Sequence, residues 1–448
     1  MKTIREIGTD ILHEVLENGA YANLQLKKAL ASLEYSRDRA FLTNLVYGSI
    51  HRLTPVDYQL ARFLTKPVKA KDIYLKTILR TALFELLFTA AKEHAVVNEY
   101  VNLGKKRGNP GWAKMINGIL RNVLRQKSTL VWPEFSDEGM KTAFYYSIPS
   151  WLVSLWQKER GEEVASQLLA SMTYEPTPVL RANTLKTDRE KLQKKLAEKN
   201  IDTVQGTLSP DALRLVQGTD IDRIPKTWQP YYTVQEESSQ LVSFVLDPQP
   251  EDRVLDMCAA PGGKTTHLAQ RMKNEGTILA SDLYEHKVAL IRDNAKRLGI
   301  TMIEAVQKDG TAWGKECPRQ FDKILLDAPC SGLGVFHRRA DSRLRKNSGD
   351  IEALASLQRE LLDSAYQCLK PGGYLLYSTC TLSNAENRGN LGWFLDTYSD
   401  MKSVDFSLRL HGLTDIEADQ ARKGYLELLP YIHHTDGFFI SLMKKDSL

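Results

Sequence analysis

Cysteine is scarce in this sequence, and the few cysteines present form no metal-binding or disulfide pattern. Their number is odd, and no two of them have the C-x-x-C spacing. A disulfide framework is excluded because such frameworks belong to short secreted chains with paired cysteines, and a zinc site lacks its ligand pattern. We expect reduced thiols and no metal. The five cysteines are Cys258, Cys317, Cys330, Cys368 and Cys380.

Long apolar runs are also missing. No stretch reaches the ~18 consecutive apolar residues that span a bilayer, and residues 1–6 are charged and lack the apolar core of a signal peptide. We therefore expect a cytosolic protein with no membrane partner. Apolar residues make up 42% and charged residues 26%, which excludes a disordered or collagen-like chain. The length of 448 residues predicts about three domains, or two of unequal size.

Charge is unevenly distributed along the chain. The first 150 residues hold 22 Lys+Arg and 14 Asp+Glu, a net charge of +8, so the remaining 298 carry −3 of the total of +5. A basic module beside a near-neutral one suggests a polyanionic partner for the basic part. A Lys-rich solvated helical surface explains the same numbers, and charge alone leaves both interpretations open.

The first part of the chain is predicted to be entirely helical. Apolar residues recur at helical spacing over 73–88 and 111–127, and no strand-like alternation interrupts residues 1–130. We expect a compact all-α domain over these residues.

Residues 131–245 mix several signals. A helical stretch covers 150–172 and is broken at Glu175-Pro176, and short apolar runs and a charged helix over 188–199 follow. This mixture predicts a small α+β connector subdomain.

Over 246–448, short apolar strands alternate with helices. Continuous apolar strands are typical of a sheet that is buried on both faces, and the alternation predicts a parallel, doubly wound, Rossmann-like α/β domain. The predicted strands cover 253–258, 277–282, 303–308, 323–328 and 373–379, with helices over 264–274, 286–298 and 351–369.

Carboxylates and cysteines follow these strands at the points where the strands end. In such sheets, ligands bind at the carboxyl ends of the strands. One edge of the predicted sheet therefore collects the candidate site. Its residues are Asp256 and the loop after it, then Asp282, Asp309, Asp327 with Cys330, and Ser378-Thr379-Cys380.

The first of these loops ends like a phosphate-binding loop, with Gly263-Lys264-Thr265. However, Cys258 stands where that pattern needs its first glycine, and Pro261 removes an amide that would contact phosphate. The loop also lacks the G-x-G-x-x-G pattern. Asp282 lies 26 residues after Asp256, about where a ribose-binding acid is found in such units. The loop predicts a nucleoside-containing cofactor without indicating which one.

Two of the cysteines have a special setting. Cys330 and Cys380 each occupy the first turn after a predicted strand, and both face one pocket if those strands are neighbours. One thiol then serves as a nucleophile and the second as its acid–base partner. The alternative is a small hydrophobic residue, which we expect of Cys317 and Cys368 and leave open for Cys258.

Three segments, 256–265, 327–332 and 377–381, together resemble the RNA cytosine-5 methyltransferases, which use S-adenosylmethionine. Asp436-Gly437-Phe438-Phe439 and Arg181-Ala182-Asn183-Thr184-Leu185 are similar to the same family. The helical part resembles the NusB-type RNA-binding fold around 97–99 and 116–121. Over nearly the whole chain, this combination resembles the bacterial Sun/Fmu (RsmB) family of 16S ribosomal RNA cytosine-5 methyltransferases.

The resemblance implies S-adenosylmethionine as the cofactor and 16S ribosomal RNA as the partner, and we expect a monomer. It also implies that Cys380 attacks C6 of a cytosine, that Cys330 assists product release and that Asp327 contacts N3. The order of the two cysteines does not follow from their spacing. The implied cofactor-binding residues are Cys258, Ala259, Ala260, Pro261, Gly262, Gly263, Lys264, Asp282 at the ribose, Asp309 near the adenine, and Asp327.

The loop over 336–346 carries five Arg or Lys residues and one Phe. This composition favours contacts with RNA phosphates and a stacked base, although an exposed basic loop has the same composition. Two other functions stay open. One is methylation of transfer RNA. The other is a non-catalytic RNA-binding or assembly factor, which a degenerate cofactor loop or a missing cysteine would favour.

Overall fold

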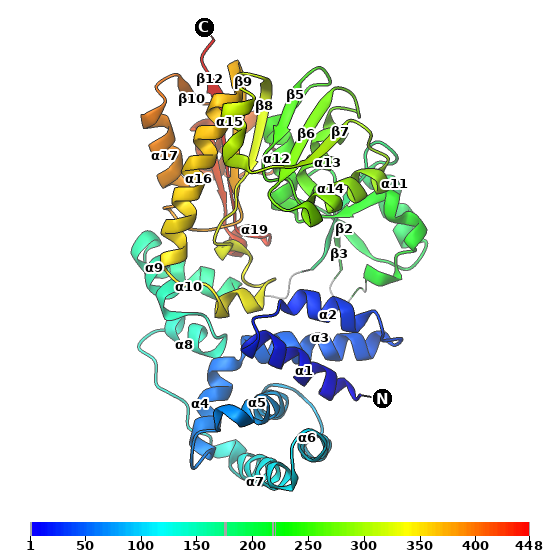
Figure 1. The fold of residues 1–448 in the computed structure, drawn as a ribbon, viewed down its shortest axis with the longest axis vertical. Helices are drawn as coiled ribbons and strands as arrows, with labels where there is room; N and C mark the ends of the chain where they lie inside the picture. Colours follow the sequence, from blue (N-terminus) through cyan, green and yellow to red (C-terminus); the bar gives the residue numbers. More distant parts are fainter. Residues whose placement is uncertain (1, 174–176, 217–218, 220, 448) are drawn as a thin grey trace. The chain divides into compact units, whose positions relative to one another are not determined.

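The computed structural model describes residues 2–173, 177–216, 219 and 221–447. The chain divides into two compact units (Figure 1). The helical unit consists of Met1–Tyr174 and Phe336–Lys346, and the sheet unit consists of Glu175–Val335 and Asn347–Leu448. The break expected at Glu175-Pro176 lies outside the described residues. The three domains expected over 1–130, 131–245 and 246–448 stay a prediction.

The helical unit contains no strand among its described residues. Several helices begin at a side chain that accepts a hydrogen bond from a free backbone N–H, such as Thr3 before α1 and Asn109 before α7. The elements are α1 (Ile4–Glu17), α2 (Ala22–Leu30), α3 (Ser36–His51), α4 (Leu53–Phe63), η1 (Ala70–Asp72), α5 (Ile73–Phe88), α6 (Glu93–Arg107), α7 (Pro110–Gln126), η2 (Lys127–Thr129), α8 (Glu138–Tyr145), α9 (Ser150–Arg160), α10 (Glu162–Ser171) and η7 (Ala340–Leu344).

The centre of the helical unit is α5. It is buried on all sides, as expected of a helix that is apolar around its whole circumference, and it packs against α3, α4, α6 and α7. Its one buried acid, Glu85, accepts hydrogen bonds from Arg5 Nε at 2.9 Å and from the Tyr100 hydroxyl at 3.0 Å. The expected single stretch over 150–172 is instead two helices, because Gly161 has φ of +82°, a conformation outside the helical region.

The sheet unit begins with a four-stranded antiparallel sheet in the order β2-β3-β1-β4. Helix α11 packs on this sheet and is capped by Asp188. The expected small α+β subdomain is therefore present. Its elements are β1 (Val179–Ala182), α11 (Arg189–Ala197), β2 (Thr203–Gln205), β3 (Ala212–Leu215), η3 (Ile221–Arg223), η4 (Lys226–Tyr231) and β4 (Tyr232–Val234).

The rest of the sheet unit is an eight-stranded sheet in the order β10-β12-β9-β8-β5-β6-β7, with β11 paired to β12. The elements are α12 (Glu237–Leu246), β5 (Arg253–Asp256), α13 (Gly263–Arg271), β6 (Thr277–Asp282), α14 (Glu285–Leu298), β7 (Ile303–Gln307), η5 (Gly310–Ala312), α15 (Trp313–Glu316), β8 (Phe321–Asp327), η6 (Leu333–Val335), α16 (Gly349–Cys368), β9 (Leu369–Thr379), α17 (Arg388–Thr397), β10 (Met401–Ser403), η8 (Ser407–Arg409), α18 (Asp415–Arg422), β11 (Tyr425–Leu428), α19 (Pro430–His433) and β12 (Phe438–Lys445).

This sheet is mixed rather than purely parallel. Strands β5 to β9 are parallel, but β12 pairs antiparallel with β9, β10 and β11. The expectation of a wholly parallel sheet was therefore wrong at this edge. A strand buried on both faces has the same continuous apolar pattern in either direction, so the pattern of β12 does not encode its orientation.

Burial on both faces of the sheet is confirmed by the packing. Neighbouring residues of one strand belong to different cores: Val254 packs with α12 and α13, and Leu255 packs with α16. The same alternation occurs at Leu325 and Leu326. The expected fold class is confirmed: a helical domain, a small α+β subdomain and a Rossmann-like domain.

Candidate active site

The loop after β5 turns sharply into α13. Gly262 has φ of +96°, and a Cβ there would lie 3.2 Å from Cα of Ile291, so the position favours glycine for both conformation and space. Thr265, in the first turn of α13, donates a hydrogen bond to Oδ2 of Asp256 at 2.7 Å. The loop over 258–263 is thereby held as a short turn of small residues.

Three of the predicted acids meet around Cys258. Burial raises the pKa of this thiol, and the charges of Asp256, Asp327 and Asp282 raise it further. Cys258 therefore stays protonated and is no nucleophile. Asp309 is exposed, and its carboxylate accepts a hydrogen bond from the backbone N–H of Thr311 at 2.9 Å, so it caps η5.

Asp256 is the most deeply buried of these acids, with 1% of its surface exposed. Burial raises its pKa to about 7, and the neighbouring charge of Asp327 contributes in the same direction. This acid is therefore partly protonated near neutral pH, which limits the negative charge around Cys258.

The fourth strand end carries an ion pair. Nζ of Lys264 lies 2.7 Å from Oδ2 of Asp327, and the Ser378 hydroxyl donates to Oδ1 of the same carboxylate at 2.9 Å. Burial alone would lower the pKa of Lys264, but Asp327 and then Cys380 outweigh it, and the pKa is raised. A permanent ammonium group therefore lies beside both Asp327 and Cys380.

Cys330 and Cys380 meet because β8 and β9 are neighbours in the sheet. Their Sγ atoms are 3.4 Å apart. The hydrogen bond with Cys380 raises the pKa of Cys330, and burial, Cys380, Glu386 and Asp327 raise it further. Two thiols in hydrogen-bond contact titrate as a pair, so one of them retains its proton when the other ionises. We call Cys330, Cys380, Lys264 and Asp327 the thiol cluster.

Two further side chains support this cluster, and the sequence did not reveal them. Glu386 is fully buried and accepts hydrogen bonds from the backbone N–H of Ser331 at 2.8 Å and from Nε2 of Gln358 at 3.0 Å. Glu386 lies in a coil without periodicity, and its partners are 55 and 28 residues away. Only the tertiary structure brings them together.

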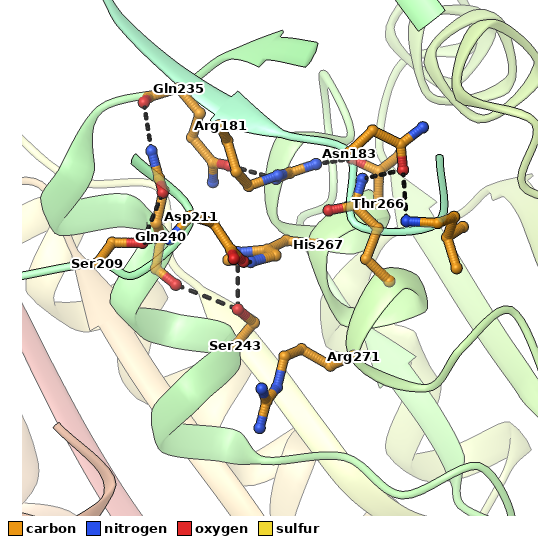
Figure 2. Close-up of polar contacts among 12 residues, drawn as sticks. Arg181, Asn183, Ser209, Asp211, Gln235, Gln240, Ser243, Thr266, His267 and Arg271 are labelled. Atoms are coloured by element: carbon orange, nitrogen blue, oxygen red, sulfur yellow. Dashed lines mark hydrogen bonds and ion pairs between the residues drawn. The ribbon is translucent and has the colours of Figure 1, made fainter. Parts of the chain in front are cut away.

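A second polar row in the sheet unit has the residue types of a hydrolase triad. Figure 2 shows His267 between Ser243 and Asp211, with 2.7 Å from Nδ1 to the Ser243 hydroxyl and 3.0 Å from Nε2 to Oδ2 of Asp211. Ser243 and His267 each expose 1% of their surface, and burial lowers the pKa of His267 to about 4. We call these three residues the histidine cluster; a neutral ring enclosed in this way serves structure.

Arg181 lies next to the histidine cluster (Figure 2). Its guanidinium donates to the backbone carbonyl of Gly263 at 2.6 Å, to Thr266 at 3.1 Å and to Gln235. The Arg181 segment of β1 therefore holds the first turn of α13, which gives this sequence motif a structural role.

The basic loop over 336–346 differs from its predicted role. Arg343 exposes 3% of its surface and donates to the backbone carbonyls of Tyr146 at 2.6 Å and Met172 at 3.2 Å. Asp341 accepts from the N–H of Ala22, and Arg345 donates to the backbone carbonyl of Ala20. Both arginines are held by the helical unit; a phosphate contact was wrong for the buried Arg343, and the phosphate contacts of the other basic residues of this loop stay a prediction.

Among the residues that the structure describes, no group of three His, Cys, Asp or Glu side chains is placed to hold a metal ion. In the same part of the chain, no helix is long and apolar enough to cross a membrane. Cys317 and Cys368 pack in the core on the α16 face of the sheet.

Family models match three segments of the chain in order. The NusB family matches residues 2–125, the ferredoxin-like domain of RsmF/B-like methyltransferases matches 148–222, and the 16S rRNA methyltransferase RsmB/F family matches 243–444. The second match falls on the small α+β subdomain and the helices before it.

Relatives and solved structures extend over similar lengths. The probable ribosomal RNA small subunit methyltransferase B of Bacillus subtilis is 37% identical, over 99% of this chain and 99% of that protein. The crystal structure of PH0851 has a TM-score of 0.83 at 28% identity and covers 99% of both chains. NSun6 from Pyrococcus horikoshii, solved with SFG, an S-adenosylmethionine analogue, has a TM-score of 0.59 at 26% identity, over 66% of this chain and 98% of that one.

A doubly wound sheet with these relatives is the fold of an S-adenosylmethionine-dependent methyltransferase. The family follows from the full-length identity and from the order of the three matched domains. The chain belongs to the ribosomal RNA small subunit methyltransferase B (RsmB/F) family.

The residues present fit this cofactor. S-adenosylmethionine carries two ribose hydroxyl donors, an ammonium and a sulfonium, and the acids around Cys258 supply acceptors and negative charge for such groups.

Proposed function

We propose that this protein methylates C5 of a cytosine in 16S ribosomal RNA, with Cys380 as the covalent nucleophile. The observation that carries the proposal is the 3.4 Å separation of the Cys330 and Cys380 sulfurs at the ends of two neighbouring strands. Two thiols at that distance can provide one nucleophile for the substrate and one proton donor for the sulfur of that nucleophile when it leaves.

The chemistry requires such a pair. C5 of cytosine is too weak a nucleophile to accept a methyl group unaided. When the Cys380 thiolate forms a bond to C6, the aromatic system is lost and C5 becomes enamine-like. S-adenosylmethionine supplies the electrophilic methyl group that C5 then takes. A base removes the C5 proton, the C5–C6 double bond re-forms and the Cys380 sulfur leaves.

The assignment of Cys380 as the nucleophile is supported by its surroundings. The ammonium of Lys264 lies close enough to Cys380 for the two charges to stabilise each other, which favours a thiolate at this position. The hydrogen bond with Cys380, burial and the nearby carboxylates raise the pKa of Cys330, so Cys330 is assigned as the group that donates a proton, as a hydrogen bond or in full, to the Cys380 sulfur when that sulfur leaves C6. Asp327, held by Lys264 and Ser378, is assigned to N3 of the base.

The cofactor is assigned to the loop over 258–264 and to the acids beside it. Asp282 is the acceptor for the ribose hydroxyls, because it ends β6 next to that loop with 8% of its surface exposed. Asp309, at the end of the next strand, is assigned to the adenine side. Asp327 lies between the cofactor and the base.

The proposed substrate, 16S ribosomal RNA, comes from the names of the relatives and of the matched family. The NusB-like domain supports an RNA partner for the basic part of the chain. A cytosolic, monomeric enzyme stays a prediction. No feature of the described residues favours transfer RNA or a non-catalytic assembly factor.

The test is methylation of small-subunit RNA that lacks its modifications, followed by mapping of 5-methylcytosine. We expect one cytosine in 16S RNA to gain a methyl group at C5, and none in the Cys380→Ala variant. Methylation of transfer RNA alone would overturn the substrate assignment, and a methyl group at another atom would overturn the mechanism.

A further inference from the structure

Each cysteine of the thiol cluster is followed by a hydroxyl residue, and the two hydroxyls meet. Oγ of Ser331 lies 2.7 Å from Oγ1 of Thr381. Both contact the same carboxylate: Ser331 donates to Oε2 of Glu386, and Thr381 Oγ1 lies 3.5 Å from that oxygen. The turns after β8 and β9 are therefore joined through one buried acid.

The other oxygen of Glu386 anchors the cysteine turn from its two sides. Oε1 accepts the backbone N–H of Ser331 at 2.8 Å, and it accepts Nε2 of Gln358 at 3.0 Å. Nε2 of Gln358 also donates to the backbone carbonyl of Pro329 at 2.9 Å. The residues immediately before and after Cys330 are thus tied to one hydrogen-bonded group.

We propose that Glu386 is a positioning residue that holds Cys330 and Cys380 at reacting distance and places one negative charge beside the Cys330 thiol. This inference rests on the proposed function, because it gives Glu386 a role in the covalent step assigned there. Several donors converge on this fully buried side chain, and hydrogen bonds to the charged form of a carboxyl group favour that form.

The charge has a chemical consequence for Cys330. The titratable groups that face its thiol are Cys380, Glu386 and Asp327, with Lys264 paired to Asp327 and the Tyr377 hydroxyl close by. The hydrogen bond with Cys380, burial and the two carboxylates all raise the pKa of Cys330. Glu386 therefore helps to keep an S–H group available for the leaving sulfur of Cys380.

Glu386→Gln removes the charge and leaves the size nearly unchanged. A carboxamide also presents an NH₂ group where Glu386 meets donors, so at least one of the present hydrogen bonds is lost. We expect Cys330 to ionise at a lower pH in this variant, by at least about one pH unit.

The first measurement needs no RNA. In a Cys380→Ala background, the pH dependence of iodoacetamide alkylation at Cys330, read by peptide mass spectrometry, reports a single titration rather than a coupled pair. Glu386→Gln should move the midpoint to lower pH, and Glu386→Asp, which retains the charge, should restore most of it. An unchanged midpoint in folded Glu386→Gln would overturn the electrostatic role.

A matched control is Glu237→Gln. Glu237 is also a fully buried carboxylate of the sheet unit and accepts the backbone N–H of Ser209 at 2.8 Å, but none of its contacts reaches the thiol cluster. Its substitution tests general loss of a buried acid. If Glu237→Gln shifts the Cys330 midpoint as much as Glu386→Gln does, the shift is a general effect of unfolding, and the proposal is overturned.

The second measurement uses the full chain with both cysteines and RNA. Glu386→Gln should accumulate a covalent protein–RNA species that survives denaturation, and more of it at pH 9 than at pH 7, because the Cys330 proton is lost earlier. Normal turnover without the species would overturn the positioning role. Failure of the covalent mechanism is recognised separately, because then Cys330→Ala forms no such species either, whereas the alkylation result is independent of it.

Discussion

The thiol cluster and the histidine cluster lie in the same unit and use similar hydrogen bonds, yet only one of them has the properties of a reaction centre. In the histidine cluster, Asp211 can only accept, so Nε2–H donates to it and Nδ1 of the neutral ring is an acceptor; the single hydrogen of the Ser243 hydroxyl is offered to Nδ1 and to the carbonyl of Gln240. The ring is neutral because burial lowers its pKa to about 4. Its surface is 1% exposed, so it is closed to a substrate.

The thiol cluster differs in charge and in access. Its two sulfurs share their protons, and an ammonium and a carboxylate lie beside them. Both cysteines are partly exposed. Residue types alone therefore do not identify a site: the triad types of the histidine cluster are structural, and the cluster with two adjacent, partly exposed thiols is the functional candidate.

The largest expected difference between the clusters is in how methyl transfer responds when Cys380 is replaced in one and Ser243 in the other. Cys380→Ala should abolish methyl transfer and form no covalent species with RNA, because the bond to C6 cannot form. Folded protein of the Ser243→Ala variant, which changes the histidine cluster, should still transfer the methyl group. Single-turnover assays with labelled cofactor measure both.

Cys330→Ala sharpens this prediction further. If Cys330 acts when the Cys380 sulfur leaves, this variant should still attack C6 but release slowly, and a protein–RNA band should persist in a denaturing gel. The double variant should show no band. A band in Cys380→Ala and none in Cys330→Ala would reverse the two roles, and activity in both without any band would end the covalent mechanism.

The next effect concerns the ammonium of the thiol cluster. Lys264→Met should lower kcat by at least about a hundredfold, roughly 2.7 kcal/mol, because a preorganised charge next to the reacting atoms is removed. Lys370→Met is the control, since Lys370 also lies 2.7 Å from an aspartate, Asp322, but in a pair that is more exposed than that of Lys264 and Asp327. Exposed pairs contribute little. Equal losses in both variants would remove Lys264 from the mechanism.

Much of this site follows from local sequence patterns. The strands β5 to β9 were predicted within a few residues, because strands buried on both faces have short continuous apolar runs. The meeting of Asp282, Asp327 and Cys258 follows from the rule that parallel strand ends share one edge. That edge is where the predicted acids and thiols lie; their individual roles stay predictions.

The remaining features depend on contacts that no local pattern encodes. Arg343 lies in a loop whose composition is typical of a solvated basic segment. Its hydrogen-bond partners, Tyr146 and Met172, are 197 and 171 residues away in the chain. Backbone carbonyls that accept from an arginine leave no trace in the sequence. Glu386 was not predicted for the same reason, because the groups that donate hydrogen bonds to it come from the turn after β8 and from α16.

A smaller effect is expected on the pH dependence of the stability of the folded protein, and it tests whether the buried His267 ring is held neutral. The pKa of His267 is lowered to about 4 in the folded protein, against about 6.5 in an unfolded chain. The stability that the neutral ring supports is present above pH 6.5 and is lost as the pH falls towards 4. Between pH 7 and pH 5 this amounts to about 2 kcal/mol. In His267→Gln, the free energy of unfolding measured with urea should fall by that much less between pH 7 and pH 5 than in the unchanged protein. An equal fall in both proteins would mean that the ring is not held neutral.

The smallest effect concerns cofactor binding at an acid that belongs to neither cluster. Asp282 lies at the end of β6, outside the thiol and histidine clusters, and Asp282→Ala should raise the dissociation constant of S-adenosylmethionine by at least about tenfold, roughly 1.4 kcal/mol. The reason is the loss of charge-assisted hydrogen bonds from the ribose hydroxyls. Asp405→Ala is a matched control, because Asp405 is also a carboxylate that accepts a backbone N–H, from Ser407 at 2.8 Å, but it is not among the acids that surround Cys258. Calorimetric titration without RNA measures cofactor affinity directly, and RNA binding should change little in either variant. If Asp282→Ala binds the cofactor as tightly as Asp405→Ala does, the acid only terminates its strand, and the ribose site must be sought at another strand end.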